Sequence, residues 1–390
     1  MDIKLHWYLP TSGDGRTIAD RAFPALDGQA TVGHSPLAGT AAAAVRSPDI
    51  EYLAQIARSA EQLGFDAVLT PTGLWCEDAW LVTSALARET ERLKFIVAFR
   101  PGLTSPVLAA QMAGTFQRLS RGRLLLNVVS GGHSDELRRF GDFTPHDERY
   151  ARCDEFLAVV RGAWGTEPYD FDGKYYQVTG ATVFAPPDPV PAIYFGGSSP
   201  PAGGVAARRA DVYLSFGEPP PQLAEKIEWI RRAAAVEGRT LRFGMRIHVL
   251  TRDRPEDAWV AADRLLSLAD PGEFVSAERT LAVSESVGQR RQQELLAKYR
   301  LSRDPRDLQV YPGLWAGIGL LRGGAGVAMV GSHEQVADLI EDYAGYGVQE
   351  FILSGYPHLE EAYWFGEGVL PELRRRGLTG EGLRLAGASA

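Results

Sequence analysis

The sequence predicts an α/β fold, a (β/α)8 TIM barrel with insertions on its βα loops. Eight short apolar, β-branched runs alternate with longer amphipathic segments along the 390 residues, as in a parallel sheet covered by helices. The composition, 45% hydrophobic and 23% charged, is typical of a globular chain with a sizeable core. A doubly wound open sheet is the alternative, but no G-x-G-x-x-G motif follows the first strand, which disfavours its dinucleotide-binding form.

The predicted strands are short, as strands between crossover helices usually are. They cover residues 3–9, 67–70, 95–99, 124–129, 192–195, 212–215, 243–250 and 351–353. Four of the helices between them begin at recognisable caps: Ser47-Pro48, Ser105-Pro106, Thr144-Pro145, and Ser332 with Gln335 three residues later. The first of these helices is expected to stop at Gly64, the second to end near Gly122, and the last to end by Gly347. We therefore expect one domain over residues 1–390.

Two stretches are longer than a minimal barrel requires. Residues 16–46, rich in Ala and Gly, follow the first strand, and residues 270–331 precede the last βα unit. Insertions on βα loops lie at the C-terminal mouth of a barrel, where chemistry occurs. Because the second stretch contains the glycine-rich run 322–326, we expect it to form a mobile lid after strand 7.

Charge and cysteine content exclude several function classes. The net charge of -8 argues against nucleic acid or an anionic membrane as a partner. The chain has no apolar run long enough to span a membrane and begins without a signal peptide. Its two cysteines are far apart, which fits a reducing cytoplasm and a cytoplasmic location. Scattered histidines without a CxxC or HExxH motif predict no metal site.

The most informative strand is 243–250. Side chains alternate between the two faces of a strand, so Arg246 and His248 share one face and Met245, Ile247 and Val249 the other. The apolar face is expected to pack against helices, which places the arginine and histidine inside the barrel. A guanidinium buried without a partner is costly, so we expect an anion beside Arg246. An internal salt bridge is the alternative.

A second candidate site follows the strand at 192–195. The run Gly196-Gly197-Ser198-Ser199 precedes Pro200-Pro201 and a helical pattern. Glycine lets a backbone approach an anion, serine hydroxyls donate hydrogen bonds, and a helix N-terminus adds positive potential. These features predict a phosphate site, with an ordinary strand-to-helix turn as the alternative.

Further polar residues are predicted at the same mouth. Cys76 follows the second predicted strand, and its thiol is either activated by a helix start or simply buried. Cys153 lies in an amphipathic helix and is assigned to packing. Tyr356 and His358 come directly after the last strand, and Arg291 lies on the second insertion. Together with Arg246 and His248 they predict an anionic substrate beside a phosphate-bearing cofactor.

Taken together, segments spread over most of the chain resemble the bacterial luciferase-like flavin monooxygenases, and among these most closely the alkanesulfonate monooxygenases. The matching segments are residues 7–11, 13–15, 71–73, 76–80, 100–101, 148–150, 194–199, 217–220, 286–289, 314–317 and 354–362. Their joint occurrence in this order is specific, although no single segment is.

The resemblance implies a monooxygenase that uses reduced FMN (FMNH2) and O2, with the flavin supplied by a separate NAD(P)H:FMN reductase. It implies cleavage of the C–S bond of an organosulfonate to sulfite and an aldehyde, by a homodimer or homotetramer. The active-site residues so assigned are Cys76, Arg246, His248, Arg291 and Tyr356. Those assigned to the cofactor are Tyr150, Gly197, Ser198, Ser199 and Ser130. Those assigned to the substrate are Trp7, Trp75 and His358.

The chain departs from common desulfonating members of this family. Leu74-Trp75 replaces their Arg-Ser before the motif cysteine, Ser12 replaces a histidine, and the insertion at 16–46 is longer. Trp75 offers a surface on which a sugar can stack, so a larger polar sulfonate such as sulfoquinovose is a candidate substrate beside simple alkanesulfonates. Two alternatives are a deazaflavin-dependent dehydrogenase of the same fold and a non-catalytic flavin-binding barrel.

Overall fold

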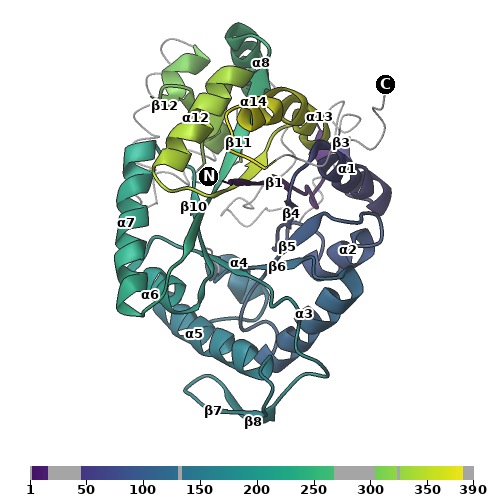
Figure 1. Ribbon diagram of the computed structural model, residues 1–390, viewed down its shortest axis with the longest axis vertical. Coiled ribbons are helices and arrows are strands. Elements are labelled where there is room, and N and C mark those ends of the chain that lie inside the picture. Colours follow the sequence, from purple (N-terminus) through teal and green to yellow (C-terminus); the bar gives the residue numbers. More distant parts are fainter. Residues whose placement is uncertain (1, 16–44, 131–133, 268–303, 323–325, 381–390) are drawn as a thin grey trace.

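The computed structural model describes residues 2–15, 45–130, 134–267, 304–322 and 326–380, in which eight parallel strands form a barrel surrounded by helices (Figure 1). In chain order these strands are β1 (Lys4–Tyr8), β4 (Ala67–Thr70), β5 (Lys94–Phe99), β6 (Leu124–Val128), β9 (Ile193–Gly196), β10 (Val212–Phe216), β11 (Arg242–Arg252) and β15 (Glu350–Ser354). Each pairs in parallel with the next, and β15 pairs with β1. This closure confirms the TIM-barrel prediction and excludes the open sheet.

All eight predicted strands are barrel strands, with ends displaced by at most two residues. The helices are α1 (Ile50–Leu63), α2 (Ala79–Leu86), α3 (Pro106–Ser120), α4 (Ser134–Arg139), α5 (His146–Ala163), α6 (Pro200–Arg209), α7 (Pro220–Val236), α8 (Pro255–Ser267), α11 (Gly317–Arg322), α12 (His333–Gly345), α13 (His358–Trp364) and α14 (Leu370–Arg375), with the 3-10 turn η2 (Pro305–Leu308) and the π-helical turn η3 (Phe365–Val369). None of the helices in the described part of the chain is long and apolar enough to cross a membrane.

The helix caps confirm two predicted starts and correct one. Ser105 caps α3 through the backbone N–H of Leu108, and Ser332 caps α12 in a capping box with Gln335. The first helix begins later than predicted, because the carboxylate of Asp49, and not Ser47, accepts the free N–H of Tyr52. Gly64 ends that helix with a φ of 96°, a conformation that glycine adopts without strain.

The first predicted insertion is described only at its stem. Residues 16–44 lie outside the described residues, and the flanking strands β2 (Asp14–Gly15) and β3 (Val45–Arg46) pair antiparallel. This stem places Asp14 close to the C-terminal end of β1, at the barrel mouth.

The second insertion contains three strands that the sequence pattern does not predict. Residues 268–303, which include most of the predicted lid, lie outside the described residues. After them, β12 (Gln309–Tyr311) and β13 (Leu314–Trp315) lead to β14 (Ala328–Ser332), which pairs in parallel with residues 248–252 of β11. The long strand β11 therefore joins the barrel along its first half and this side sheet along its second.

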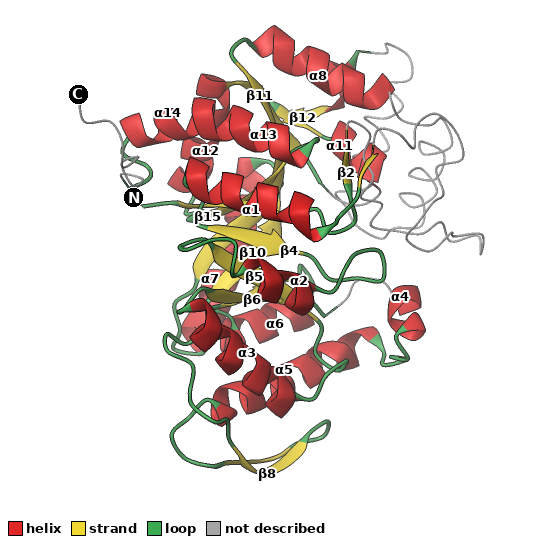
Figure 2. Cartoon of the chain, turned by 90° about the vertical axis from the view of Figure 1, so that its right-hand side faces the viewer, coloured by secondary structure: helices red, strands yellow, loops and turns green. Residues whose placement is uncertain are grey.

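A further hairpin lies outside the barrel. The strands β7 (Tyr169–Asp172) and β8 (Gln177–Ala181) pair antiparallel and protrude beyond α3 and α5 in both views (Figures 1 and 2). The barrel mouth, at the C-terminal ends of the eight strands, lies away from this hairpin, so the hairpin does not contribute to the site described below.

Candidate functional site

The strand β11 places Arg246 and His248 inside the barrel, as its alternating pattern predicts. Met245, Ile247 and Val249 belong to the apolar cluster between the strands and the helices. The guanidinium carbon of Arg246 lies 4.4 Å from the ring centre of Tyr8 on β1, a residue of the barrel-interior cluster. Arg246 remains partly exposed, so a ligand at the mouth can reach it.

His248 and two residues after β15 continue this group. The Nδ1 atom of His248 lies 2.5 Å from the Ser354 hydroxyl, and its ring centre lies 5.8 Å from that of Tyr356. The Tyr356 ring meets the His358 ring edge-on at 4.7 Å, and His358 stacks on Tyr8 at 5.4 Å. We call the five residues Tyr8, Arg246, His248, Tyr356 and His358 the mouth cluster.

Four members of the mouth cluster were predicted, and Tyr8 was missed. The motif-based assignment chose its neighbour Trp7, but alternation along β1 turns Trp7 away from the interior. The indole of Trp7 is fully buried, tilts against Phe65 at 5.2 Å, and donates a hydrogen bond to the His358 carbonyl at 3.1 Å. Strand alternation, applied to β1 as it was to β11, would have identified Tyr8.

The carboxylate of Asp14 contacts both the backbone and the ring of His358. The carboxylate accepts hydrogen bonds from the backbone N–H of His358 at 2.9 Å and from its ring Nδ1 at 3.0 Å. Both side chains are completely buried. Burial alone would raise the pKa of Asp14, but the charge and hydrogen bonds of His358 and the hydroxyl of Tyr52 outweigh it, so the pKa lies below its ordinary value.

Asp14 is also connected to the other strand of the insertion stem, β3, through Tyr52. The hydroxyl of Tyr52, on α1, donates a hydrogen bond to Asp14 and accepts one from Arg46 of β3 at 2.9 Å. Arg46 also forms a two-point ion pair with Glu360 of α13. The stem is therefore fixed to the segment that carries His358.

The predicted phosphate site is assembled from two helices and a loop. Ser199 is the N-cap of α6 and accepts from Ala202 N–H at 3.4 Å. Gly197 has a φ of 149°, and a Cβ atom there would lie 2.5 Å from that of Ala202 and 3.5 Å from the Tyr150 hydroxyl. Burial raises the pKa of Tyr150, and a hydrogen bond with Ser199 partly opposes this. Tyr150, Ser198 and Ser199 thus offer hydroxyls beside a helix N-terminus, and only glycine fits between them.

Ser130 lies near this site, behind the buried thiol of Cys153. Burial raises the pKa of the Cys153 thiol to about 12, and the neighbouring Ser130 hydroxyl partly opposes this. A thiol so far from ionisation is inert, and the assignment of Cys153 to packing is confirmed by its complete burial.

Cys76 and Trp75 lie on the loop after β4, which is attached to its neighbours. Glu77 N–H donates to the Thr11 carbonyl at 3.0 Å, and the thiol of Cys76 lies 3.6 Å from the Gly73 carbonyl. Both Trp75 and Cys76 are partly exposed. Their loop lies at the barrel mouth, whereas Arg291 lies outside the described residues.

One residue of this loop region was not predicted. The side chain of Glu136, on α4, accepts from Leu74 N–H at 2.9 Å and pairs with Arg100, the residue after β5, at 2.6 Å. Arg100 is only 7% exposed. This buried pair fixes the Trp75 loop against the end of β5. No spacing in the sequence indicates the pair, because its members lie on different βα units.

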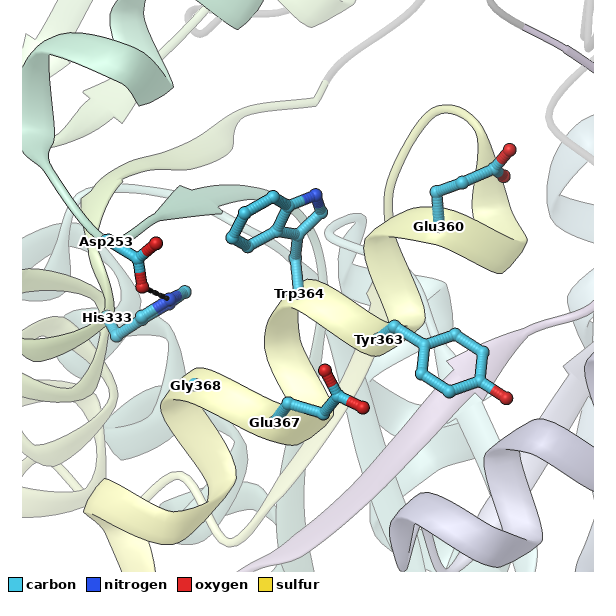
Figure 3. Close-up of a pocket in the computed structure, with 7 residues that line it drawn as sticks. All are labelled: Asp253, His333, Glu360, Tyr363, Trp364, Glu367 and Gly368. Atoms are coloured by element: carbon cyan, nitrogen blue, oxygen red, sulfur yellow. Dashed lines mark ion pairs between the residues drawn. The ribbon is translucent and has the colours of Figure 1, made fainter.

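A separate hollow of about 650 Å³ lies outside the barrel (Figure 3). It is lined by Asp253, His333, Glu360, Tyr363, Trp364, Glu367 and Gly368, which come from the turn after β11 and from α12, α13 and η3. None of the predicted site residues that the structure describes lines it. The mouth cluster, and not this hollow, is therefore the candidate active site.

Comparisons with solved structures support the fold. The chain resembles riboflavin lyase RcaE, solved with modified FMN and riboflavin, at a TM-score of 0.74 and 20% identity, covering 98% of this chain and 94% of that one. It resembles EDTA monooxygenase EmoA from Chelativorans sp. BNC1 at a TM-score of 0.73 and 19% identity, covering 97% of this chain and 95% of that one. It resembles an F420-dependent secondary alcohol dehydrogenase at a TM-score of 0.64 and 17% identity, covering 96% of this chain and 100% of that one.

The match to a protein family decides the assignment, since structures at such identities show the fold alone. The family described as luciferase-like monooxygenase matches residues 29–350, which include seven of the eight barrel strands at least in part and every predicted site residue except Trp7, Tyr356 and His358. The chain belongs to the luciferase-like monooxygenase family.

Proposed function

We propose that this protein is a two-component monooxygenase that uses FMNH2 and O2 to cleave the C–S bond of an organosulfonate, giving sulfite and an aldehyde. The observation that carries the proposal is the mouth cluster. It gathers a guanidinium, two imidazoles and two phenols at the C-terminal ends of β1, β11 and β15. An anion of sulfonate size can be bound there by charge and by hydrogen-bond donors.

The residues of the phosphate site fit the phosphate of FMN. Hydroxyls of Tyr150, Ser198 and Ser199 and the first N–H groups of α6 supply donors, and the cradle at Gly197 has no room for a side chain. Ser130 is assigned to the same end of the flavin. When bound, reduced FMN supplies the activation of oxygen; the protein supplies position, charge and exclusion of water.

Five residues assigned to the active site have separate roles. Arg246 binds the sulfonate as a permanent cation, because a guanidinium does not lose its proton in proteins. His248, held by Ser354, and Tyr356 donate hydrogen bonds to the oxygens that gain charge. Arg291 adds charge from the second insertion, and Cys76 lines the mouth on the loop after β4.

The substrate is proposed to be either an alkanesulfonate or a larger polar sulfonate. The partly exposed indole of Trp75 offers a flat surface for a sugar ring, which favours a sulfosugar such as sulfoquinovose. Its loop is fixed by Glu136 and Arg100, so the indole surface is preformed. A flavin reductase as the partner and a homodimer or homotetramer as the assembly complete the proposal.

The test is sulfite release with FMN, NAD(P)H, O2 and a generic flavin reductase. We expect release from one member of a panel that contains short and long alkanesulfonates, taurine and sulfoquinovose, and none when the reductase is omitted. Failure with every sulfonate, despite tight binding of FMNH2, would exclude sulfonate cleavage on this panel. Reduction of F420 by an alcohol under the same conditions would support the deazaflavin dehydrogenase instead, the class of one structural neighbour.

Gly197→Ala is expected to weaken FMNH2 binding by about 10- to 100-fold. The new Cβ would collide with Ala202 and crowd the Tyr150 hydroxyl, and loss of one or two hydrogen bonds to phosphate costs about 1–3 kcal/mol. Anaerobic titration of FMNH2 by fluorescence measures the change. Gly180→Ala is the matched control, because Gly180 also has a positive φ but has open space around it. Equal affinity of the Gly197 variant and the wild type would place the phosphate elsewhere.

A further inference from the structure

Within the mouth cluster, the ring of His358 is held by a carboxylate, that of Asp14. A carboxylate only accepts hydrogen bonds, so the proton between Asp14 and the ring belongs to Nδ1. The backbone N–H of His358 donates to the same carboxylate, and Trp7 donates to its carbonyl. Three hydrogen bonds therefore fix the residue in one orientation, and the contact with Asp14 places the proton of a neutral ring on Nδ1.

The other ring nitrogen of His358, Nε2, lies on the side of the ring away from Asp14. This atom is buried and has no hydrogen-bond partner among the described residues. The ring lies against the face of Tyr8 and the edge of Tyr356, and Arg246 covers Tyr8. A buried nitrogen lone pair without a donor is costly, which indicates that a ligand supplies the donor.

The proposed reaction requires a proton acceptor. In balanced form, RCH2SO3⁻, FMNH2 and O2 give RCHO, SO3²⁻, FMN, water and one proton. Oxygen takes two electrons from FMNH2 and two from the substrate carbon, and its atoms end in the aldehyde and in water. The proton comes from the carbon that was bound to sulfur. The electron pair of its C–H bond becomes part of the new C=O bond of the aldehyde. Arg246 cannot take this proton, because it is already protonated.

We propose that Asp14 and His358 form a carboxylate–histidine pair in which Asp14 directs the Nε2 lone pair of His358 into the mouth to accept this proton. The proposal rests on the proposed function and adds Asp14 as a positioning residue. The carboxylate stabilises the imidazolium that forms, as buried carboxylates do beside catalytic histidines. Charged and titratable groups around the pair are Tyr8, Arg246, Tyr356, Tyr52 and, through Tyr52, Arg46 with Glu360.

The first test reads the tautomer directly and needs neither substrate nor flavin. Histidine-labelled ¹⁵N protein is studied by NMR at a pH where the rings are neutral, and the His358 signals are identified by their loss in His358→Gln. We expect the proton on Nδ1 in the wild type and its shift toward Nε2 in Asp14→Asn. Asp253→Asn, which alters the exposed pair of Asp253 with His333, is the matched control and should leave the His358 signals unchanged.

The second test measures kcat and KM for sulfite release. We expect Asp14→Asn and His358→Gln to lower kcat by at least about tenfold with little change in KM, and Asp14→Glu to restore part of the loss. Wild-type His358 with its proton on Nε2, or Asp14→Asn with wild-type kcat, would overturn the proposal. If Asp14→Asn does not fold, the proposal is tested by the tautomer of His358 in the wild type and by the kcat of His358→Gln. The expected tautomer without sulfite from any sulfonate would reject the proposed function and retain the pair.

Discussion

Arg246→Ala is expected to lower kcat/KM for sulfite release by about 10³-fold, the largest loss of activity from a single substitution at the mouth. Removal of a group that stabilises developing negative charge commonly lowers the rate by about 10²–10³-fold. Loss of the bidentate hydrogen bonding of the guanidinium adds to this. Arg246→Lys keeps the charge but loses the planar fork, so its loss should be smaller.

The variant should remain folded, because the contact removed is modest. A guanidinium over a phenol ring contributes about 0.5–2 kcal/mol, and Arg246 is partly exposed. Steady-state sulfite release and the circular dichroism melting curve separate activity from stability. Arg231→Ala, at an exposed ion pair on α7, is the control and should keep full activity. Wild-type kcat/KM in Arg246→Ala would remove this residue from the proposed site.

The barrel was predictable because each of its strands is a short apolar run between amphipathic helices. The strands outside the barrel lack this signal. Residues of β7 alternate between half-buried and exposed, and most residues of β8 are exposed. The strand β14 follows the glycine-rich run 322–326, so it was counted as part of an insertion. Its partner, the second half of β11, is specified by pairing across the molecule and not by local sequence.

Prediction of the site depended on which residues share a strand. Arg246 and His248 are two residues apart, and the period of a strand places them on one face. Asp14 and His358 are separated by 344 residues, and no local pattern brings them together. Trp7 and Tyr8 illustrate the same point, since a motif shows that a residue belongs to a family pattern but not which way its side chain points.

Glu350→Ala is expected to lower the free energy of unfolding by about 3–5 kcal/mol, the largest loss of stability from removal of a single charge in the described part of the chain. Glu350 is 1% exposed and begins β15 inside the N-terminal end of the barrel. Its carboxylate meets His6 at 3.1 Å, accepts from the Tyr194 hydroxyl at 2.5 Å, and pairs with Arg242. Removal leaves these groups without their shared acceptor, and breaking a buried pair in this way costs about that amount.

The same network predicts how stability depends on pH. Burial would raise the pKa of Glu350, but hydrogen bonds and charges from His6, Tyr194 and Arg242 hold it below its ordinary value. A carboxyl whose pKa is lower in the folded than in the unfolded state stabilises the fold at pH values above its pKa in the unfolded state, about 4.3. That contribution is lost as the pH falls through the lower, folded value.

Urea unfolding of the wild type, Glu350→Gln and Glu350→Ala at several pH values between about 3.5 and 7 tests both statements. The free energy of unfolding of the wild type should exceed that of Glu350→Gln at neutral pH, and this difference should decrease only below about pH 4. The reason is that only the wild type has a carboxyl to protonate at position 350. Glu89→Gln, which removes the charge of an exposed pair with Arg58, should cost less than about 1 kcal/mol at every pH. An equally small cost for Glu350→Ala would mean that water replaces the carboxylate, and that the N-terminal end of the barrel is open to solvent.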